Sequence, residues 1–159
     1  MKMNKLLATG VFAMMGAVAV QGHDDRFQPV PQLQGVWKTQ ITILDCVSGN
    51  KLAGPFPGFI AFQAGGTIGE SGPALPNSTR GAGFGVWQRS GRNTFVETLT
   101  FQRFDLTGIY LGTQVIHATP KVADDSQSYV AAGGTFEVKD PAGTTLATGC
   151  SYATGTRFK

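Results

Sequence analysis

The chain has 159 residues, of which 42% are hydrophobic and 14% are charged, and its formal net charge at pH 7 is +3. A charge this small gives no reason to expect a nucleic-acid partner or attraction to an anionic membrane surface. Two of the basic residues, Lys2 and Lys5, lie in the first 22 residues, and without that segment the charge is about +1 on a chain long enough for one domain.

Residues 1–22 have the features of an export signal. Lys2 and Lys5 form a basic start, the run Leu6–Val20 is apolar, and Ala17–Ala19 fits a small-x-small cleavage site. The alternative is a membrane anchor, but an apolar run of about 15 residues is short for a span, which needs roughly 20. We therefore predict a cleaved signal, a periplasmic or secreted protein, and no membrane span after cleavage.

Residues 23–34 are polar and contain two prolines, which predicts an extended lead-in to a domain that occupies residues 35–159. From Gly35 to Cys46 the pattern alternates, as in a half-buried β-strand. The residues expected on the drier face of this strand are Trp37, Thr39, Ile41 and Ile43.

The next part of the chain combines turn residues with short apolar runs. Val47–Gly58 carries two clusters of Gly, Pro, Ser and Asn, so it is predicted to be a loop. Phe59–Gln63 and Thr67–Glu70 are predicted strands joined by a turn. Ser71–Gly83 is expected to be a long irregular loop that flanks an opening of the fold.

The second half of the chain consists of alternating segments separated by tight turns, with no helical periodicity. The predicted strands are Phe84–Arg89, Thr94–Phe104, Ile109–Thr119, Ser128–Lys139 and Thr144–Phe158. About eight strands joined mostly by short turns predict an all-β fold, an antiparallel up-and-down barrel whose first and last strands pair. A two-sheet sandwich is the alternative.

The pairing of first and last strands is supported by two pairs of residues. If the strands run antiparallel, one register places Cys46 beside Cys150 and Trp37 beside Arg157. Two cysteines in an exported chain predict one disulfide, and a loop of roughly a hundred residues corresponds to about 4–5 kcal/mol of stabilisation. The alternative is two free thiols in a reducing compartment.

The tight turns also indicate which side chains point inward. The turn Asp105–Gly108 places one mixed aromatic and charged set on a common face: Phe95, Glu97, Leu99, Phe101, Arg103, Tyr110, Gly112, Gln114 and Ile116. Its larger aromatic volume favours the interior, although a β-bulge would reverse the assignment. The turn Asp140–Gly143 places a second set on the Trp37 side: Val130, Ala132, Gly134, Phe136 and Val138.

The barrel lumen is therefore the candidate binding site. Its predicted ligand-binding residues are Trp37, Phe95, Glu97, Leu99, Phe101, Arg103, Tyr110, Gln114 and Phe136. Glu97 and Arg103 in an apolar lumen indicate a polar anchor for a ligand or an acid–base residue. The structural alternatives are an internal Glu–Arg salt bridge or charges in contact with water at the mouth.

Other chemistry finds little support in the sequence. It contains no Gly-x-Ser-x-Gly nucleophile motif and no His/Cys cluster, so we predict neither a metal site nor a cofactor. On the outer face Ile109, Leu111 and Val115 alternate, and an apolar stripe of this kind is compatible with a homo-oligomer.

Two short motifs carry a resemblance to a known group. The triplet Gly35-Val36-Trp37 is similar to the Gly-x-Trp signature of the calycins, which include lipocalins and avidins, and Arg157 is similar to the arginine that packs across that tryptophan. The chain also resembles the small cyclase barrels typified by allene oxide cyclase, which share the eight-strand plan. Neither the other short lipocalin motifs nor the final helix of many lipocalins is found.

The resemblance implies an exported, lipocalin-like β-barrel that binds a small hydrophobic molecule. The alternative is a cyclase or isomerase acting on an apolar substrate in the lumen, with Glu97 as the catalytic residue, assisted by Arg103 or Tyr110. A third hypothesis is a structural protein whose barrel is only a stable scaffold.

Overall fold

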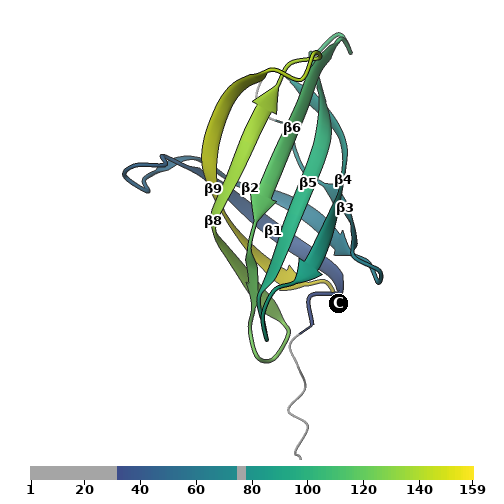
Figure 1. Cartoon of the computed structure of the whole chain (residues 1–159), viewed down its shortest axis with the longest axis vertical. Helices are drawn as coiled ribbons and strands as arrows, with labels where there is room; N and C mark the ends of the chain where they lie inside the picture. The colour runs from purple at the N-terminus through teal and green to yellow at the C-terminus, as the bar shows by residue number, and fades with distance from the viewer. Residues whose placement is uncertain (1–31, 75–77) are drawn as a thin grey trace, which may run out of the picture.

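The computed structural model describes residues 32–74 and 78–159, which form a closed antiparallel β-barrel (Figure 1). The strands in this part of the chain are β1 (Gly35–Leu44), β2 (Lys51–Phe62), β3 (Thr67–Ser71), β4 (Thr79–Arg89), β5 (Phe95–Phe104), β6 (Tyr110–Ala118), β7 (Pro120–Val122), β8 (Ser128–Lys139) and β9 (Thr145–Arg157). None of the described residues is helical, so this part of the chain contains no helix that could cross a membrane.

The strands follow one another around the barrel in chain order. Strand β1 pairs with β2 on one side and with β9 on the other, and pairing of β6 with β8 closes the ring. Strands β6 and β7 are two parts of one strand interrupted at Thr119, so the ring has eight positions. This arrangement confirms the predicted all-β, eight-stranded barrel with paired first and last strands, and excludes the two-sheet sandwich.

The β1–β9 seam has the predicted register. Trp37 pairs with Arg157, and the register continues without a shift to Leu44 and Cys150. Just beyond the end of β1, Cys46 forms a disulfide with Cys150, with 5.2 Å between the two Cα atoms. The predicted disulfide is therefore confirmed. It lies on the outer side of the barrel, where it links the loop after β1 to strand β9.

Arg157 connects three segments at the opposite end of the seam. Its guanidinium lies 4.2 Å from the centre of the Trp37 ring. It donates hydrogen bonds to the main-chain oxygens of Ser126 (2.7 Å), Gln34 (2.8 Å) and Gln32 (2.7 Å). The lead-in, the loop before β8 and the end of β9 are thus attached to one side chain.

Large apolar side chains fill this end of the barrel. Trp37, Phe62 and Phe95 are almost completely buried, and the Trp37 and Tyr129 rings meet edge to face at 5.1 Å. Leu33 is also fully buried, and its main-chain oxygen accepts a hydrogen bond of 2.7 Å from Trp37 Nε1. The predicted signal segment and most of the lead-in lie outside the described residues, but the last part of the lead-in belongs to this core.

The predicted loop Val47–Gly58 is wrong for most of its length, because β2 begins at Lys51. Ile41 pairs with Phe56 whereas Ile43 pairs with Ala53, so β2 carries extra residues at a bulge. A bulge accommodates a proline that cannot donate to the ladder. The loop that remains projects from the side of the barrel (Figure 1).

The predicted inner face of β8 is correct for only part of the strand. Ala131 pairs with Ala153, but Gly134 pairs with Ser151, because an extra residue is accommodated where Gly133 adopts a φ of 73°. A bulge exchanges the faces of a strand. Before the bulge, Tyr129 and Ala131 are buried and the predicted pair, Val130 and Ala132, is exposed. After it, Gly134, Phe136 and Val138 are on the predicted side.

A bulge at the start of β6 alters a third prediction. Arg103 pairs with Gly112 whereas Phe104 pairs with Tyr110, so Leu111 is the extra residue. Tyr110 consequently lies outside the lumen, 39% exposed, with its ring 5.9 Å from that of Phe104. Ile109 precedes the strand, so the predicted outer stripe is not a regular row.

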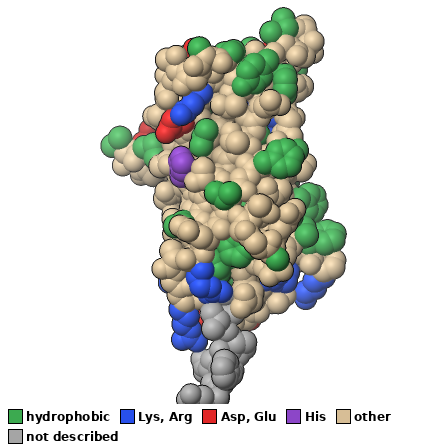
Figure 2. All heavy atoms as spheres, turned by 45° about the vertical axis from the view of Figure 1, so that its right-hand side comes forward, with side chains coloured by type: hydrophobic (Ala, Val, Ile, Leu, Met, Phe, Trp, Pro, Cys, Tyr) green, Lys and Arg blue, Asp and Glu red, His purple; other side chains and the backbone are tan. Residues whose placement is uncertain are grey.

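Exposed hydrophobic residues occur elsewhere on the outer surface, for example Phe59, Phe84 and Val86. On the face that Figure 2 shows, most hydrophobic side chains stand apart from one another among polar and main-chain atoms. A homo-oligomer therefore stays a prediction.

The disulfide closes a long loop, so its removal should reduce stability considerably. For a sequence separation of 104, loop entropy predicts that Cys46→Ser/Cys150→Ser lowers the free energy of unfolding by about 4–5 kcal/mol. Urea denaturation followed by tryptophan fluorescence measures the change. A loss below about 1 kcal/mol would show that the barrel closes equally well without this link.

Candidate functional site

The aromatic core fills one end of the barrel, and the rest of the lumen contains a cavity. It lies toward the end that carries the disulfide, and its wall includes Pro73, Ala74 and Ser78 of the loop between β3 and β4. The volume of the cavity that the centres of water-sized molecules can occupy is about 100 Å³. One water needs about 10–15 Å³ on this measure, so the cavity has room for several waters or for a slender organic molecule.

Most of the predicted ligand-binding residues line this cavity. They are Glu97, Leu99, Phe101, Arg103, Gln114 and Phe136. The predicted inner face of β5 is thus correct, as is the inner position of Gln114 on β6. Trp37 and Phe95 also point inward, but they belong to the packed end and do not line the cavity. Tyr110 lies outside, for the reason given above.

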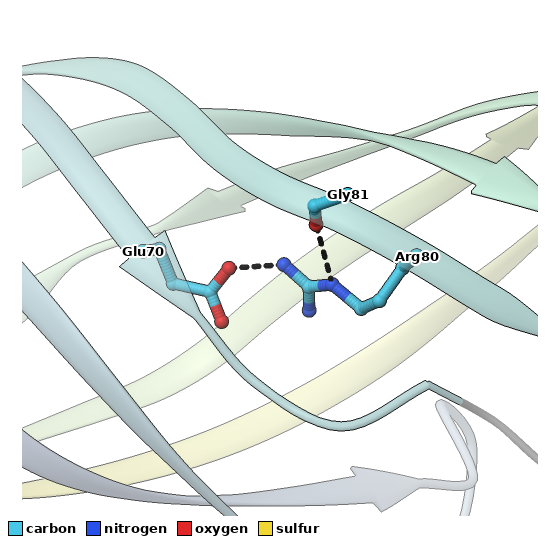
Figure 3. A network of polar contacts seen from close by, with 3 residues as sticks. All are labelled: Glu70, Arg80 and Gly81. Atoms are coloured by element: carbon cyan, nitrogen blue, oxygen red, sulfur yellow. Dashed lines mark hydrogen bonds and ion pairs between the residues drawn. The ribbon is translucent and has the colours of Figure 1, made fainter.

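Several polar residues of the site were not predicted. Glu70 on β3 and Arg80 on β4 both line the cavity and form an ion pair (Figure 3). Tyr129 on β8 was missed because the bulge reverses that part of the strand. The alternation of Ile68 and Glu70 in a short strand could have placed Glu70 inside, since residues two apart share a face. Arg80 gave no such signal, because β4 was predicted to begin only at Phe84.

The Glu70–Arg80 pair is held from several sides. Arg80 Nε donates a hydrogen bond of 3.3 Å to the main-chain oxygen of Gly81, as Figure 3 shows. The Arg80 guanidinium also lies 3.4 Å from the centre of the Phe101 ring, a cation–π contact. Gly83 leaves room for the carboxylate, because a Cβ atom at this position would lie 2.6 Å from Glu70 Oε2. A side chain at Gly83 would therefore displace Glu70.

Arg80 only partly offsets the effect of burial on the Glu70 carboxyl. Burial raises the pKa of Glu70, and the charge of Arg80 offsets some of that rise. Buried ion pairs behave this way because both partners lose their hydration. Only one Glu70 oxygen receives the Arg80 hydrogen bond, and the other, Oε1, is buried without a hydrogen-bond partner among the described residues.

Glu97 forms no ion pair with any cation in residues 32–74 and 78–159. The Glu97 side chain helps to line the cavity, and its Oε2 atom is buried. Burial, with a smaller contribution from the negative charge of Glu70, raises the pKa of Glu97 to about 7. Tyr129 lines the same cavity, and burial raises the pKa of its phenol as well, so this group stays protonated at neutral pH.

Three buried polar atoms of the cavity have no hydrogen-bond partner among the described residues. They are Thr39 Oγ1, Glu70 Oε1 and Glu97 Oε2. Buried polar atoms are usually paired, and each one left unpaired costs about 1–3 kcal/mol. The three residues all line this cavity, so a molecule bound inside it is the candidate partner for these atoms.

The salt bridge considered for Glu97 and Arg103 does not form. The ion pair inside the barrel is Glu70–Arg80, and Arg103 makes no ion pair with any residue in the described ranges. Arg103 pairs across the strands with Arg80 and is half-buried, so it contributes a positive charge to the wall of the cavity.

Comparisons with known proteins supply no family. No protein-family model matches the sequence, and no curated protein is significantly similar to it. The class that the structure defines is a small, closed, eight-stranded antiparallel β-barrel with an internal cavity. Within residues 32–74 and 78–159, no group of three or more His, Cys, Asp or Glu side chains is arranged to hold a metal ion.

The raised pKa of Glu97 predicts a pH dependence of stability. Between its usual pKa of 4.5 and about 7, the folded protein holds a proton that the unfolded chain has lost. The free energy of unfolding therefore falls as the pH rises through this range, by about 3 kcal/mol in all, and then levels off. In urea denaturation at pH 4.5, 6 and 8, Glu97→Gln should show a much smaller decrease, and the part that remains comes from Glu70, whose pKa is also raised.

Glu137→Gln is the matched control, because Glu137 lies outside the cavity and its pKa is lowered, mainly by the hydrogen bond and charge of Lys139. This variant should keep the decrease. An equal slope in wild type and Glu97→Gln would contradict the assignment of the buried proton to Glu97.

Proposed function

We propose that the protein binds a small, mainly apolar molecule inside the barrel. The observation that carries the proposal is a cavity in a closed barrel whose polar wall atoms lack partners. Ligand sites commonly combine apolar walls with a few convergent polar groups. Here Leu99, Ile116 and Phe136 supply apolar surface, and the Glu70, Arg80 and Glu97 side chains supply the polar groups.

The cavity also argues against a barrel that is only a scaffold. A scaffold gains most stability from a fully packed interior, as at the Trp37 end. Part of this lumen is instead a cavity, and its wall includes Glu97, whose Oε2 atom has no hydrogen-bond partner among the described residues.

Export and a calycin-like character belong to the same proposal. A disulfide between Cys46 and Cys150 is compatible with an oxidising compartment outside the cytoplasm. The closed eight-stranded barrel and the Trp37–Arg157 contact agree with the lipocalin-like resemblance, although a small cyclase barrel shares the strand plan. We therefore propose an exported binding protein of this general type.

Neighbouring alanines on β8 provide a sharp test of binding inside the lumen. Ala131 is buried and lines the cavity, whereas Ala132 points outward. The fluorescent apolar probe N-phenyl-1-naphthylamine should bind the wild type. Ala131→Phe should weaken binding by at least about tenfold, or ~1.4 kcal/mol, because the ring takes up cavity space. Ala132→Phe should bind the probe as the wild type does.

Fluorescence titration measures both affinities, and circular dichroism checks that each variant is folded. Equal probe binding by folded Ala131→Phe and wild type would place the binding site outside the lumen and contradict the proposal.

A second candidate function is a cyclase or isomerase. The observation that favours it is Glu97, a buried carboxyl without a partner whose pKa of about 7 suits proton transfer at neutral pH. The tyrosine that lines the same cavity is Tyr129 and not Tyr110. An apolar substrate bound there would meet a proton donor or acceptor at Glu97.

The enzyme hypothesis is tested by turnover of a panel of unsaturated and strained apolar substrates, followed by chromatography. If Glu97 transfers the proton, Glu97→Gln should lower the rate by about 10²–10⁴-fold, and Glu137→Gln should leave it unchanged. Turnover that is equal in wild type and Glu97→Gln would show that Glu97 has no catalytic role.

A further inference from the structure

The polar groups of the cavity differ in how many of their hydrogen-bond partners the protein itself supplies. Arg80 already has Glu70 and the Gly81 oxygen as partners, and its flat face lies on Phe101. The atoms without partners are all oxygens, on Thr39, Glu70 and Glu97. Two of the three belong to carboxyl groups, which accept hydrogen bonds when ionised. The cavity therefore has more capacity to accept hydrogen bonds than its own side chains use.

The charges are distributed unevenly as well. Glu70 forms an ion pair with Arg80, whereas Glu97 forms no ion pair with any cation in the described part of the chain. The other half-buried cation of the wall, Arg103, makes no ion pair with Glu97. A negative charge in a low-dielectric site is stabilised best by a positive group that also donates hydrogen bonds.

We propose that the ligand of this cavity carries a protonated amine, which binds at the Glu97 carboxyl, on a slender apolar body. This inference rests on the proposed binding function and specifies its ligand class. The ammonium group supplies three hydrogen-bond donors and one positive charge. Glu97 Oε2 is the first acceptor, and Glu70 Oε1 and Thr39 Oγ1 are further unpaired oxygens on the same wall. The apolar body then contacts Leu99, Ile116 and Phe136.

Three compounds with the same eight-carbon chain separate the contributions of charge and apolar surface. They are n-octylamine, 1-octanol and octanoate, each titrated against the protein with bound N-phenyl-1-naphthylamine. At pH 8 the amine should displace the fluorescent compound at a concentration at least about tenfold lower than the alcohol. Octanoate should bind more weakly than the alcohol, because its charge is the same as that of Glu97.

Two variants with the same chemical change test the role of the carboxyl. Glu97→Gln should bind octanol as the wild type does but lose the preference for octylamine. Glu137→Gln, which removes a carboxylate outside the cavity, should keep that preference. Isotope-edited NMR of the wild type should show octylamine shifting the amides of the inward-facing residues on β5, with Glu97 among them.

The preference should also depend on pH. The titratable and charged groups that line the cavity besides Glu97 are Glu70 on β3, Arg80 on β4, Arg103 on β5 and Tyr129 on β8. Octylamine stays protonated below pH 9, so a change between pH 8 and pH 6 reports the protein groups. Protonation of Glu97 should reduce the advantage of octylamine over octanol as the pH falls, and Glu97→Gln should abolish this change.

The outcomes distinguish this inference from the proposed function. If octanol and the fluorescent compound bind in the lumen but octylamine binds no more tightly, or if Glu97→Gln keeps the preference, the ligand class is wrong and the binding function stands. If none of the compounds binds in the lumen, the binding function itself is wrong. A preference that Glu97→Gln removes and Glu137→Gln keeps supports both.

Discussion

The contact between Trp37 and Arg157 is the constraint on which the rest of the barrel depends. A sheet of this kind closes only if its first and last strands meet in one register. The Arg157 guanidinium covers the Trp37 ring and binds the main-chain oxygens of Gln32, Gln34 and Ser126. It thereby holds the residues just before β1, the end of β9 and the loop before β8 against one another. With the ring of strands closed at this end, the large apolar side chains have a defined volume to fill.

Packing at this end of the barrel offsets the stability that is lost where the lumen contains a cavity. Rings at Trp37, Phe62, Phe95 and Tyr129 bury a large apolar area, and the disulfide at the other end restrains the chain where packing is sparse. Tyr129 lies across a glycine, Gly155, of the neighbouring strand, where a Cβ atom would come within 2.1 Å of the ring. Small residues on one strand thus make room for aromatic rings on the next, and stability is concentrated away from the cavity.

The sequence predicted strand pairing and inward-facing side chains correctly wherever a strand alternates without a bulge. Strand β1 pairs with β9 from Trp37 to Leu44 without a shift, so spacing could place Trp37 beside Arg157 and Cys46 near Cys150. The disulfide itself was predicted from this spacing together with the two cysteines and the export signal. Strand β5 alternates equally cleanly as far as Arg103, and the lumen positions of Glu97 and Leu99 followed from that pattern.

The errors have one physical origin, the β-bulge. One extra residue exchanges the two faces of a strand, and no local composition rule fixes where it occurs. The bulges near Gly133 and Leu111 therefore moved Tyr129 into the lumen and Tyr110 out of it. The Glu70–Arg80 pair was missed for a related reason: its members meet through pairing of β3 with β4, and the start of β4 was hidden in a segment rich in proline and glycine.

Glu97 is the residue that joins stability to function in this barrel. A buried carboxyl without a cation lowers stability at neutral pH, and an apolar residue of similar size would pack better in the same wall. Nothing in the architecture requires it, because Trp37, Arg157 and the disulfide close the barrel elsewhere. Its position is explained if a bound molecule supplies the hydrogen-bond donor or the positive charge that the described residues do not supply. The same reasoning applies to the second Glu70 oxygen, which Arg80 leaves unbound although its guanidinium is adjacent.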